Sequence, residues 1–138
     1  MSLYSERLAH LKKELSIIQK QKKKGFKKNQ KIMLDFINGK TNTANFVVKE
    51  VNILLRKGNV AHGFMHILLK HYKVGDLEAM DILNMAEVVE RGIVLANEGV
   101  SKDDNIVYMF LKSRKDFRLI LSPNKDNDLV ISMYRKSL

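Results

Sequence analysis

The hydrophobic periodicity of the sequence changes at Gly92, and this change constrains the fold more than any other feature. Before Gly92 the apolar residues recur at helical spacings of three and four. After it come four strand-like runs, GIVLAN, NIVYMFLKS, DFRLILS and DLVISMYRKS, separated by the turn-like segments EGVSKDD, RK and PNKDN. Short connections between consecutive strands favour antiparallel neighbours. We therefore predict an α+β fold, with N-terminal helices followed by a four-stranded antiparallel β-meander that the helices cover on one face.

Three helices are expected between residue 44 and Gly92. The first ends near Gly58 and carries an apolar stripe formed by Val47, Val51, Leu54 and Leu55. The second is the histidine-rich segment HGFMHILLKHY, residues 62–72. The third is GDLEAMDILNMAEVVERG, residues 75–92, with Gly92 as its C-terminal cap. Together with the strands, these helices make residues 44–138 one α+β domain.

Residues 1–43 are expected to form a helical, lysine-rich arm or the tail of a preceding domain. Its first helix carries an a/d seam formed by Tyr4, Leu8, Leu11, Leu15 and Ile18. Two heptads suffice for a helix that lies against another surface or a second copy, so a homodimer through this helix is one expected partnership. The segment KIMLDFING then predicts a short apolar helix that ends at Gly39.

The positive charge is concentrated in this arm. Residues 1–40 carry eleven lysines and arginines against three acidic residues, whereas residues 41–138 carry fourteen against twelve. Seven lysines lie in KQKKKGFKKNQK, residues 20–31, which contains no acidic residue. Such a run suits an anionic polymer such as RNA or an anionic lipid surface, or it is simply a solvated hinge. The expected RNA contacts are Lys22, Lys23, Lys24, Lys27, Lys28 and, from the sheet, Lys112.

Several classes of protein are disfavoured by composition. The chain has no cysteine, which excludes disulfides and thiolate zinc sites and fits a reducing compartment. No apolar run approaches the roughly 18 residues that a membrane helix needs. The apolar stretch and cleavage site of a secretory signal are also missing. We therefore expect a cytoplasmic protein without membrane association.

Three of the four histidines lie within HGFMHILLKHY. On a helix His62, His66 and Lys70 share one face, and the adjoining, mostly apolar stripe is formed by Phe64, Ile67, Leu68 and His71. A zinc ion would need a third ligand from elsewhere, and no HExxH glutamate lies between the first two histidines, so neither a metal nor another cofactor is expected. An imidazole beside an ammonium group instead suits acid–base chemistry on a phosphate. His71 is either a packed core histidine or a catalytic group, and no role is expected for His10.

The period of two in the last strands predicts a second group of functional residues. One face is expected to pack under the helices through Phe117, Leu119, Leu121, Leu129, Ile131 and Met133. Arg118, Ser132 and Tyr134 would share the opposite, open face. Lys112 lies on one face of the preceding strand with Tyr108 and Phe110. Such an open face suits single-stranded RNA, held by base stacking and phosphate contacts, or it is only the solvated side of a half-buried sheet.

A family resemblance joins these features. The segment GFMHILLKH from Gly63 to His71, the acidic helix ending in VVERG and the terminal strands together resemble the phage-borne branch of the barnase/EndoU/RelE-like ribonuclease superfamily. The resemblance covers residues 44–138, and its most specific part is the H-I-x-x-K-H run. It implies one or two helices before a four-stranded antiparallel sheet, and a metal-independent endoribonuclease or toxin. The closing strand of that group tends to end in a hydroxyl residue followed by an aromatic, which ISMYRK approximates with Ser132 and Tyr134.

The sequence thus favours an enzyme that cleaves RNA by attack of the substrate's own 2′-hydroxyl, leaving a 2′,3′-cyclic phosphate and a 5′-hydroxyl. The candidate catalytic residues are His66, His71, Lys70, Arg118, Ser132 and Tyr134. The histidines would move the protons, the arginine and lysine would stabilise the charge on phosphorus, and the hydroxyl residues would orient the phosphate or stack a base. An antitoxin or immunity protein would be a further partner. The alternatives are a non-catalytic RNA- or protein-binding module of the same fold, or a degenerate prophage remnant.

Overall fold

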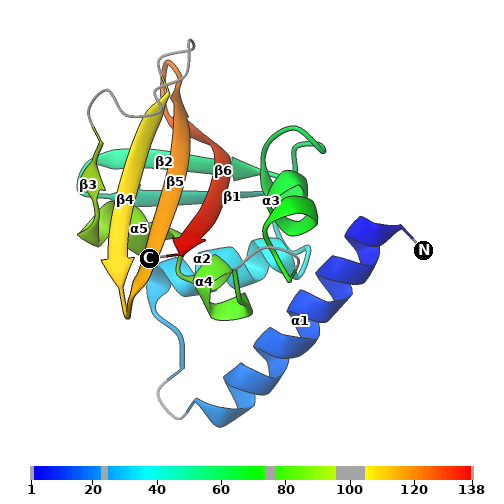
Figure 1. Ribbon diagram of the computed structural model, residues 1–138. Helices are drawn as coiled ribbons and strands as arrows, with labels where there is room; N and C mark the ends of the chain where they lie inside the picture. The colour runs from blue at the N-terminus through cyan, green and yellow to red at the C-terminus, as the bar shows by residue number, and fades with distance from the viewer. Residues whose placement is uncertain (1, 23–24, 74–76, 96–104, 138) are drawn as a thin grey trace.

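A computed structural model describes residues 2–22, 25–73, 77–95 and 105–137 (Figure 1). Its helices are α1 (Leu3–Gln21), α2 (Lys28–Ile37), α3 (Phe64–Lys70), α4 (Ala79–Leu83) and α5 (Met85–Arg91). Its strands are β1 (Thr43–Val48), β2 (Val51–Arg56), β3 (Ile93–Val94), β4 (Ile106–Lys112), β5 (Lys115–Pro123) and β6 (Asp128–Ser137). The fold is α+β, and the strands form one mixed parallel and antiparallel sheet with the order β1-β2-β6-β5-β4-β3.

The segment expected as the first helix of the domain is instead a β-hairpin. β1 and β2 pair antiparallel from Thr43 opposite Arg56 to Val48 opposite Val51. The turn residues Lys49 and Glu50 have φ values of 48° and 69°, as in the primed turns that suit two-residue hairpins. Burial alternates along β1, which is a strand pattern. The helical spacing predicted here is coincidental, because its residues are divided between two strands: Val47 on β1, and Val51, Leu54 and Leu55 on β2.

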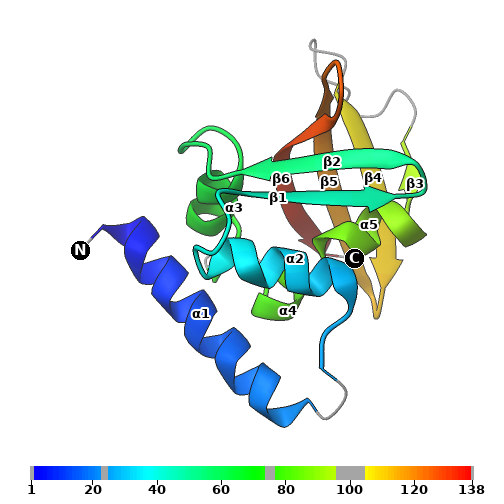
Figure 2. The ribbon, with the colours of Figure 1, turned by 180° about the vertical axis from the view of Figure 1, so that it is seen from behind.

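The sheet also corrects the expected four-stranded meander. Strands β3 to β6 do pair antiparallel in chain order. β6, however, pairs in parallel with β2 through Ile53 and Leu54, and β1 lies beyond β2, so the described residues form a sheet of six strands. Figures 1 and 2 show the β1–β2 hairpin running across the long strands β4, β5 and β6, with α2 and α5 on the same side of them as the hairpin. The hydrophobic core lies between these layers.

A β-bulge in β6 changes the predicted face assignment. Ile120 pairs with Ser132 but Leu121 pairs with Val130, so the register skips Ile131. One extra residue reverses the alternation of side chains on the far side of the bulge. Val130 is consequently buried in the core, although strict alternation with Leu129 and Ile131 would place it on the open face. The expected core positions Phe117, Leu119, Leu121 and Met133 are confirmed. Leu129 and Ile131, which were also expected in the core, are only partly buried.

The N-terminal helices share the hydrophobic core of the sheet. Leu11 and Leu15 of α1 are completely buried. The other residues of the predicted seam, Tyr4, Leu8 and Ile18, pack against the same core. Helix α2 contributes Met33, Phe36 and Ile37 to it. The core therefore continues across the boundary expected near residue 43. The apolar seam of α1 is occupied by its own chain and is not a free face for a second copy.

The helix expected over residues 75–92 is two short helices, α4 and α5, that meet at Asn84. The amide oxygen of Asn84 accepts a hydrogen bond of 2.7 Å from Nε2 of Gln30 on α2. Gly92 ends α5 as predicted, because its N–H donates to the carbonyl of Val88. A Cβ on Gly92 would lie 2.1 Å from the Val88 carbonyl oxygen and 2.6 Å from that of Met109, so a side chain does not fit there.

Replacing Leu11 with alanine is expected to lower the free energy of unfolding by roughly 2–5 kcal/mol, because it deletes a fully buried side chain from a continuous core. The matched control is Ile17→Ala on the same helix, where the side chain is 43% exposed. That change should stay within about 0.5 kcal/mol. Urea unfolding of both variants makes the comparison. Equally small effects would mean that α1 does not fold together with the sheet.

Candidate functional site

Helix α3 begins after a tight loop, residues 57–63, in which two glycines meet. Gly58 and Gly63 have φ values of 66° and 87°, and a Cβ on Gly58 would lie 2.2 Å from the carbonyl oxygen of His62. The Asn59 N–H donates to that same carbonyl at 2.9 Å, which closes the loop. The Gly63 N–H donates to the carbonyl of Ile131, the bulged residue of β6, at 2.9 Å. The bulge thus attaches the start of α3 to the sheet.

His66 is oriented by the same loop. Its Nδ1 lies 2.9 Å from the carbonyl oxygen of Val60. A carbonyl only accepts, so Nδ1 carries a proton and donates it in both the neutral and the charged ring. Nε2 is then the atom that gains or loses a proton. The loop therefore selects one tautomer of a half-buried imidazole.

His71 lies between His66 and Tyr134. Its ring centroid is 5.3 Å from that of His66, with the planes at 74°, and 5.6 Å from that of Tyr134, with the planes at 33°. Burial lowers the pKa of His71, and the nearby positive charges of His66 and Lys70 lower it further. The His71 imidazole is therefore neutral at neutral pH. These contacts join three candidates that the sequence had placed on different surfaces.

The sheet adds two further candidates on the side of Tyr134. Arg118 pairs directly with Tyr134 across β5 and β6, and Ser132 precedes Tyr134 by two residues, so the three side chains share one face. This face is not the open surface that was expected, because Arg118 is only 8% exposed and Ser132 only 6%. The Arg118 guanidinium forms a bidentate pair with Asp116, at 2.9 Å for Nε–Oδ1 and 3.0 Å for Nη2–Oδ2. Its charge is therefore partly neutralised inside the protein.

Lys112 lies on the other face of the sheet and does not join this group. The β4–β5 register places Phe110 opposite Phe117, which packs in the core, and Lys112 follows Phe110 by two residues on that face. The Lys112 ammonium pairs with the Glu87 carboxylate of α5 at 3.0 Å. The expected grouping of Lys112 with Arg118 on one RNA-binding face is therefore wrong.

The lysine-rich segment also lies away from the histidines. The start of α1 contacts α3, where the rings of Tyr4 and Phe64 are 6.4 Å apart. Figure 1 shows the end of α1 and the start of α2 away from α3. The Lys22 ammonium lies 4.9 Å from the centre of the Phe26 ring. Lys27 and Lys28, at the start of α2, are exposed. The other two expected contacts, Lys23 and Lys24, lie outside the described residues.

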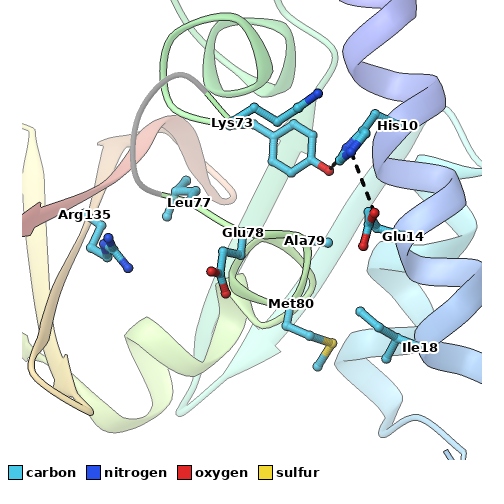
Figure 3. Close-up of a pocket in the computed structure, with 10 residues that line it drawn as sticks. His10, Glu14, Ile18, Lys73, Leu77, Glu78, Ala79, Met80 and Arg135 are labelled. Carbon is cyan, nitrogen blue, oxygen red and sulfur yellow. Dashed lines mark hydrogen bonds and ion pairs between the residues drawn. The ribbon is translucent and has the colours of Figure 1, made fainter. Parts of the chain in front are cut away.

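A separate cleft of about 550 Å³ lies between α1 and residues 72–73 and 77–80 (Figure 3). The polar side chains that line it include His10, Glu14, Lys73, Glu78 and Arg135. His10 uses both ring nitrogens there: Nδ1 is 2.6 Å from the Tyr72 hydroxyl, and Nε2 is 3.7 Å from the Glu14 carboxylate. Burial, and then the Glu14 charge, raise the pKa of Tyr72 to about 12, so this hydroxyl stays protonated beside His10. None of the predicted catalytic residues lines this cleft, and its one signal in the sequence is the i, i+4 spacing of His10 and Glu14.

Comparison with known proteins adds no identification. No protein-family model matches this sequence, and a search of curated proteins finds no similar chain. Within the described ranges, no group of three or more His, Cys, Asp or Glu side chains is placed to hold a metal ion. Across the same residues each helix is too short or too polar to cross a lipid bilayer. The candidate site is the cluster formed by His66, His71 and Tyr134.

The stability of the protein should fall as the pH is lowered through the range in which His71 titrates. The pKa of His71 is lower in the folded protein than its ordinary value, so below about pH 6.5 the unfolded chain binds the proton first. The free energy of unfolding therefore rises with pH between the folded and unfolded pKa values. Urea unfolding across this range should give a flatter profile for His71→Gln than for the wild type. His62→Gln, at an exposed position outside the cluster, should keep the wild-type profile.

Proposed function

We propose that the protein is a metal-independent endoribonuclease of the barnase/EndoU/RelE-like kind, acting at the cluster of His66, His71 and Tyr134. The observation that carries this proposal is the position of the His71 ring between His66 and Tyr134. Two imidazoles and a phenol from a helix and a distant strand supply the proton donors and acceptors that cleavage through a 2′-hydroxyl needs. An antitoxin or immunity protein stays a prediction from the family resemblance.

The environments of the two histidines favour different roles. His71 is neutral at neutral pH and is the proposed base that accepts the proton of the 2′-hydroxyl. The 2′-oxygen then forms its bond to phosphorus as the bond to the 5′-oxygen breaks. His66 in its protonated form is the proposed acid that gives the Nε2 proton to the leaving 5′-oxygen, while its Nδ1–H stays on the Val60 carbonyl. General acid–base cleavage requires one group that accepts a proton and a second that donates one.

The charge that develops on phosphorus requires a cation. Lys70 is exposed at the end of α3 and acts electrostatically on His71, so it is the proposed main cation. Arg118 lies opposite Tyr134 but shares its charge with Asp116, which gives it a secondary role. Ser132 is buried on β6, two residues before Tyr134, so we assign it to the support of Tyr134. The hydroxyl and ring of Tyr134 would orient the phosphate or stack a base.

Single-stranded RNA incubated with the protein in EDTA should yield 2′,3′-cyclic phosphate and 5′-hydroxyl ends. His66→Ala and His71→Ala should each lower the rate by about 100- to 10,000-fold, as the loss of a general acid or base does. His62→Ala should keep the rate, because His62 is exposed and lies before α3, outside the ring cluster. Circular dichroism checks that each variant is folded. A folded wild type that gives no cyclic-phosphate product would leave the non-catalytic RNA- or protein-binding module as the better proposal.

We also propose that the lysine-rich segment, residues 20–31, binds RNA through phosphate neutralisation. Replacing Lys27 and Lys28 with glutamine should then flatten the dependence of log K on log salt by roughly 0.7 for each phosphate contact that is lost. The control replaces Lys12 and Lys13, which are exposed on α1 and carry the same charge. Fluorescence anisotropy with a 2′-deoxy-substituted, uncleavable oligonucleotide measures the binding. Equal slopes for the two double variants would show that the segment makes no special contribution.

A further inference from the structure

Two side chains of α1 hold the backbone around His71. Nη1 of Arg7 donates to the carbonyl oxygens of Leu68, at 3.0 Å, and of Tyr72, at 2.6 Å. His10 Nδ1 and the Tyr72 hydroxyl are hydrogen-bonded at 2.6 Å, and Tyr72 is only 2% exposed. The residue that follows His71 is therefore fixed at its carbonyl, its ring and its hydroxyl.

Helix α3 needs such support because of its length. It has seven residues, too few for a helix that is stable by itself. The last carbonyls of a helix lack partners within it. The Ile67 carbonyl accepts from the N–H groups of both His71 and Tyr72, at 2.9 and 3.0 Å, and the next carbonyl, that of Leu68, is taken by Arg7. Arg7 thus completes the turn that carries His71.

We propose that Arg7 is a positioning residue, which sets the His71 ring against Tyr134 and His66 by holding the turn from Leu68 to Tyr72. Neighbouring side chains leave a backbone in different directions, so fixing Tyr72 between α1 and the core also fixes the direction of His71. The proposal rests on the proposed function, and it gives the N-terminal helix a role in the site itself. Arg7 touches no reacting group and acts only through His71.

The test uses the full chain with Arg7→Gln, which removes the charged donor. We expect kcat for RNA cleavage to fall about 10- to 100-fold with KM near the wild-type value, as small displacements of a catalytic group do. The nuclear Overhauser effect between the ring protons of His71 and Tyr134 should weaken in parallel. Arg7→Lys again offers one nitrogen with several hydrogens. It should restore most of kcat and most of the nuclear Overhauser effect between His71 and Tyr134. Lys13→Gln removes the same charge from an exposed position on α1 and should behave as the wild type.

The outcomes separate this proposal from the one on which it rests. A folded Arg7→Gln variant with wild-type kcat and an unchanged ring-to-ring signal would overturn the positioning role. If Arg7→Gln does not fold, Arg7→Met keeps the aliphatic stem and removes both hydrogen bonds to the carbonyls of Leu68 and Tyr72. The same two losses are expected, and wild-type values would overturn the proposal. A wild type that cleaves no RNA would contradict the proposed function alone, because the ring-to-ring signal does not depend on turnover.

Discussion

The parallel pairing of β2 with β6 is the contact on which the rest of the architecture depends. Parallel neighbours cannot be joined by a tight turn, so the chain between them has to cross over. Here the crossover contains α3, α4, α5 and the three strands β3 to β5, and β6 returns beside Ile53 and Leu54. Because α3 follows directly from the end of β2 through the loop of residues 57–63, the same pairing places α3 beside β6. The histidines of the helix meet Tyr134 for this reason.

The errors in the fold prediction have local physical causes. The turn of the β1–β2 hairpin is formed by Lys49 and Glu50, neither of which is a residue that usually marks a turn with positive φ. The bulge at Ile131 has no glycine beside it. The N–H that donates to the Ile131 carbonyl is that of Gly63, which lies far away in the sequence. Elements bounded by conventional signals were predicted well. The seam of α1, Gly39 after α2 and Gly92 after α5 all lie where the pattern indicates.

The candidate site was predicted as separate residues, and the structure shows which of them touch. The i, i+4 rule put His66 and His71 on different stripes, but α3 ends at Lys70, and His71 leaves the helix with φ −124° and ψ −18°. Alternation placed Arg118 on the same face as Tyr134. The same alternation places Asp116 on that face, two residues before Arg118. It does not reveal that Asp116 and Arg118 form a buried ion pair. A backbone carbonyl such as that of Val60, and a helix contact such as that of Arg7, leave no pattern in one sequence.

The order of the strands along the chain also has a consequence for synthesis. Tyr134 follows His71 by 63 residues, so the chain delivers the histidines well before the strand that completes their surroundings. Pairing between distant segments is slow compared with the formation of a hairpin or a helix, because the entropy of closing the loop is lost before the contact forms. A nascent chain therefore carries the histidines of residues 62–71 while Tyr134 and Arg118 are still absent. The cluster of His66, His71 and Tyr134 is therefore complete only once β6 has been synthesised and has paired with β5.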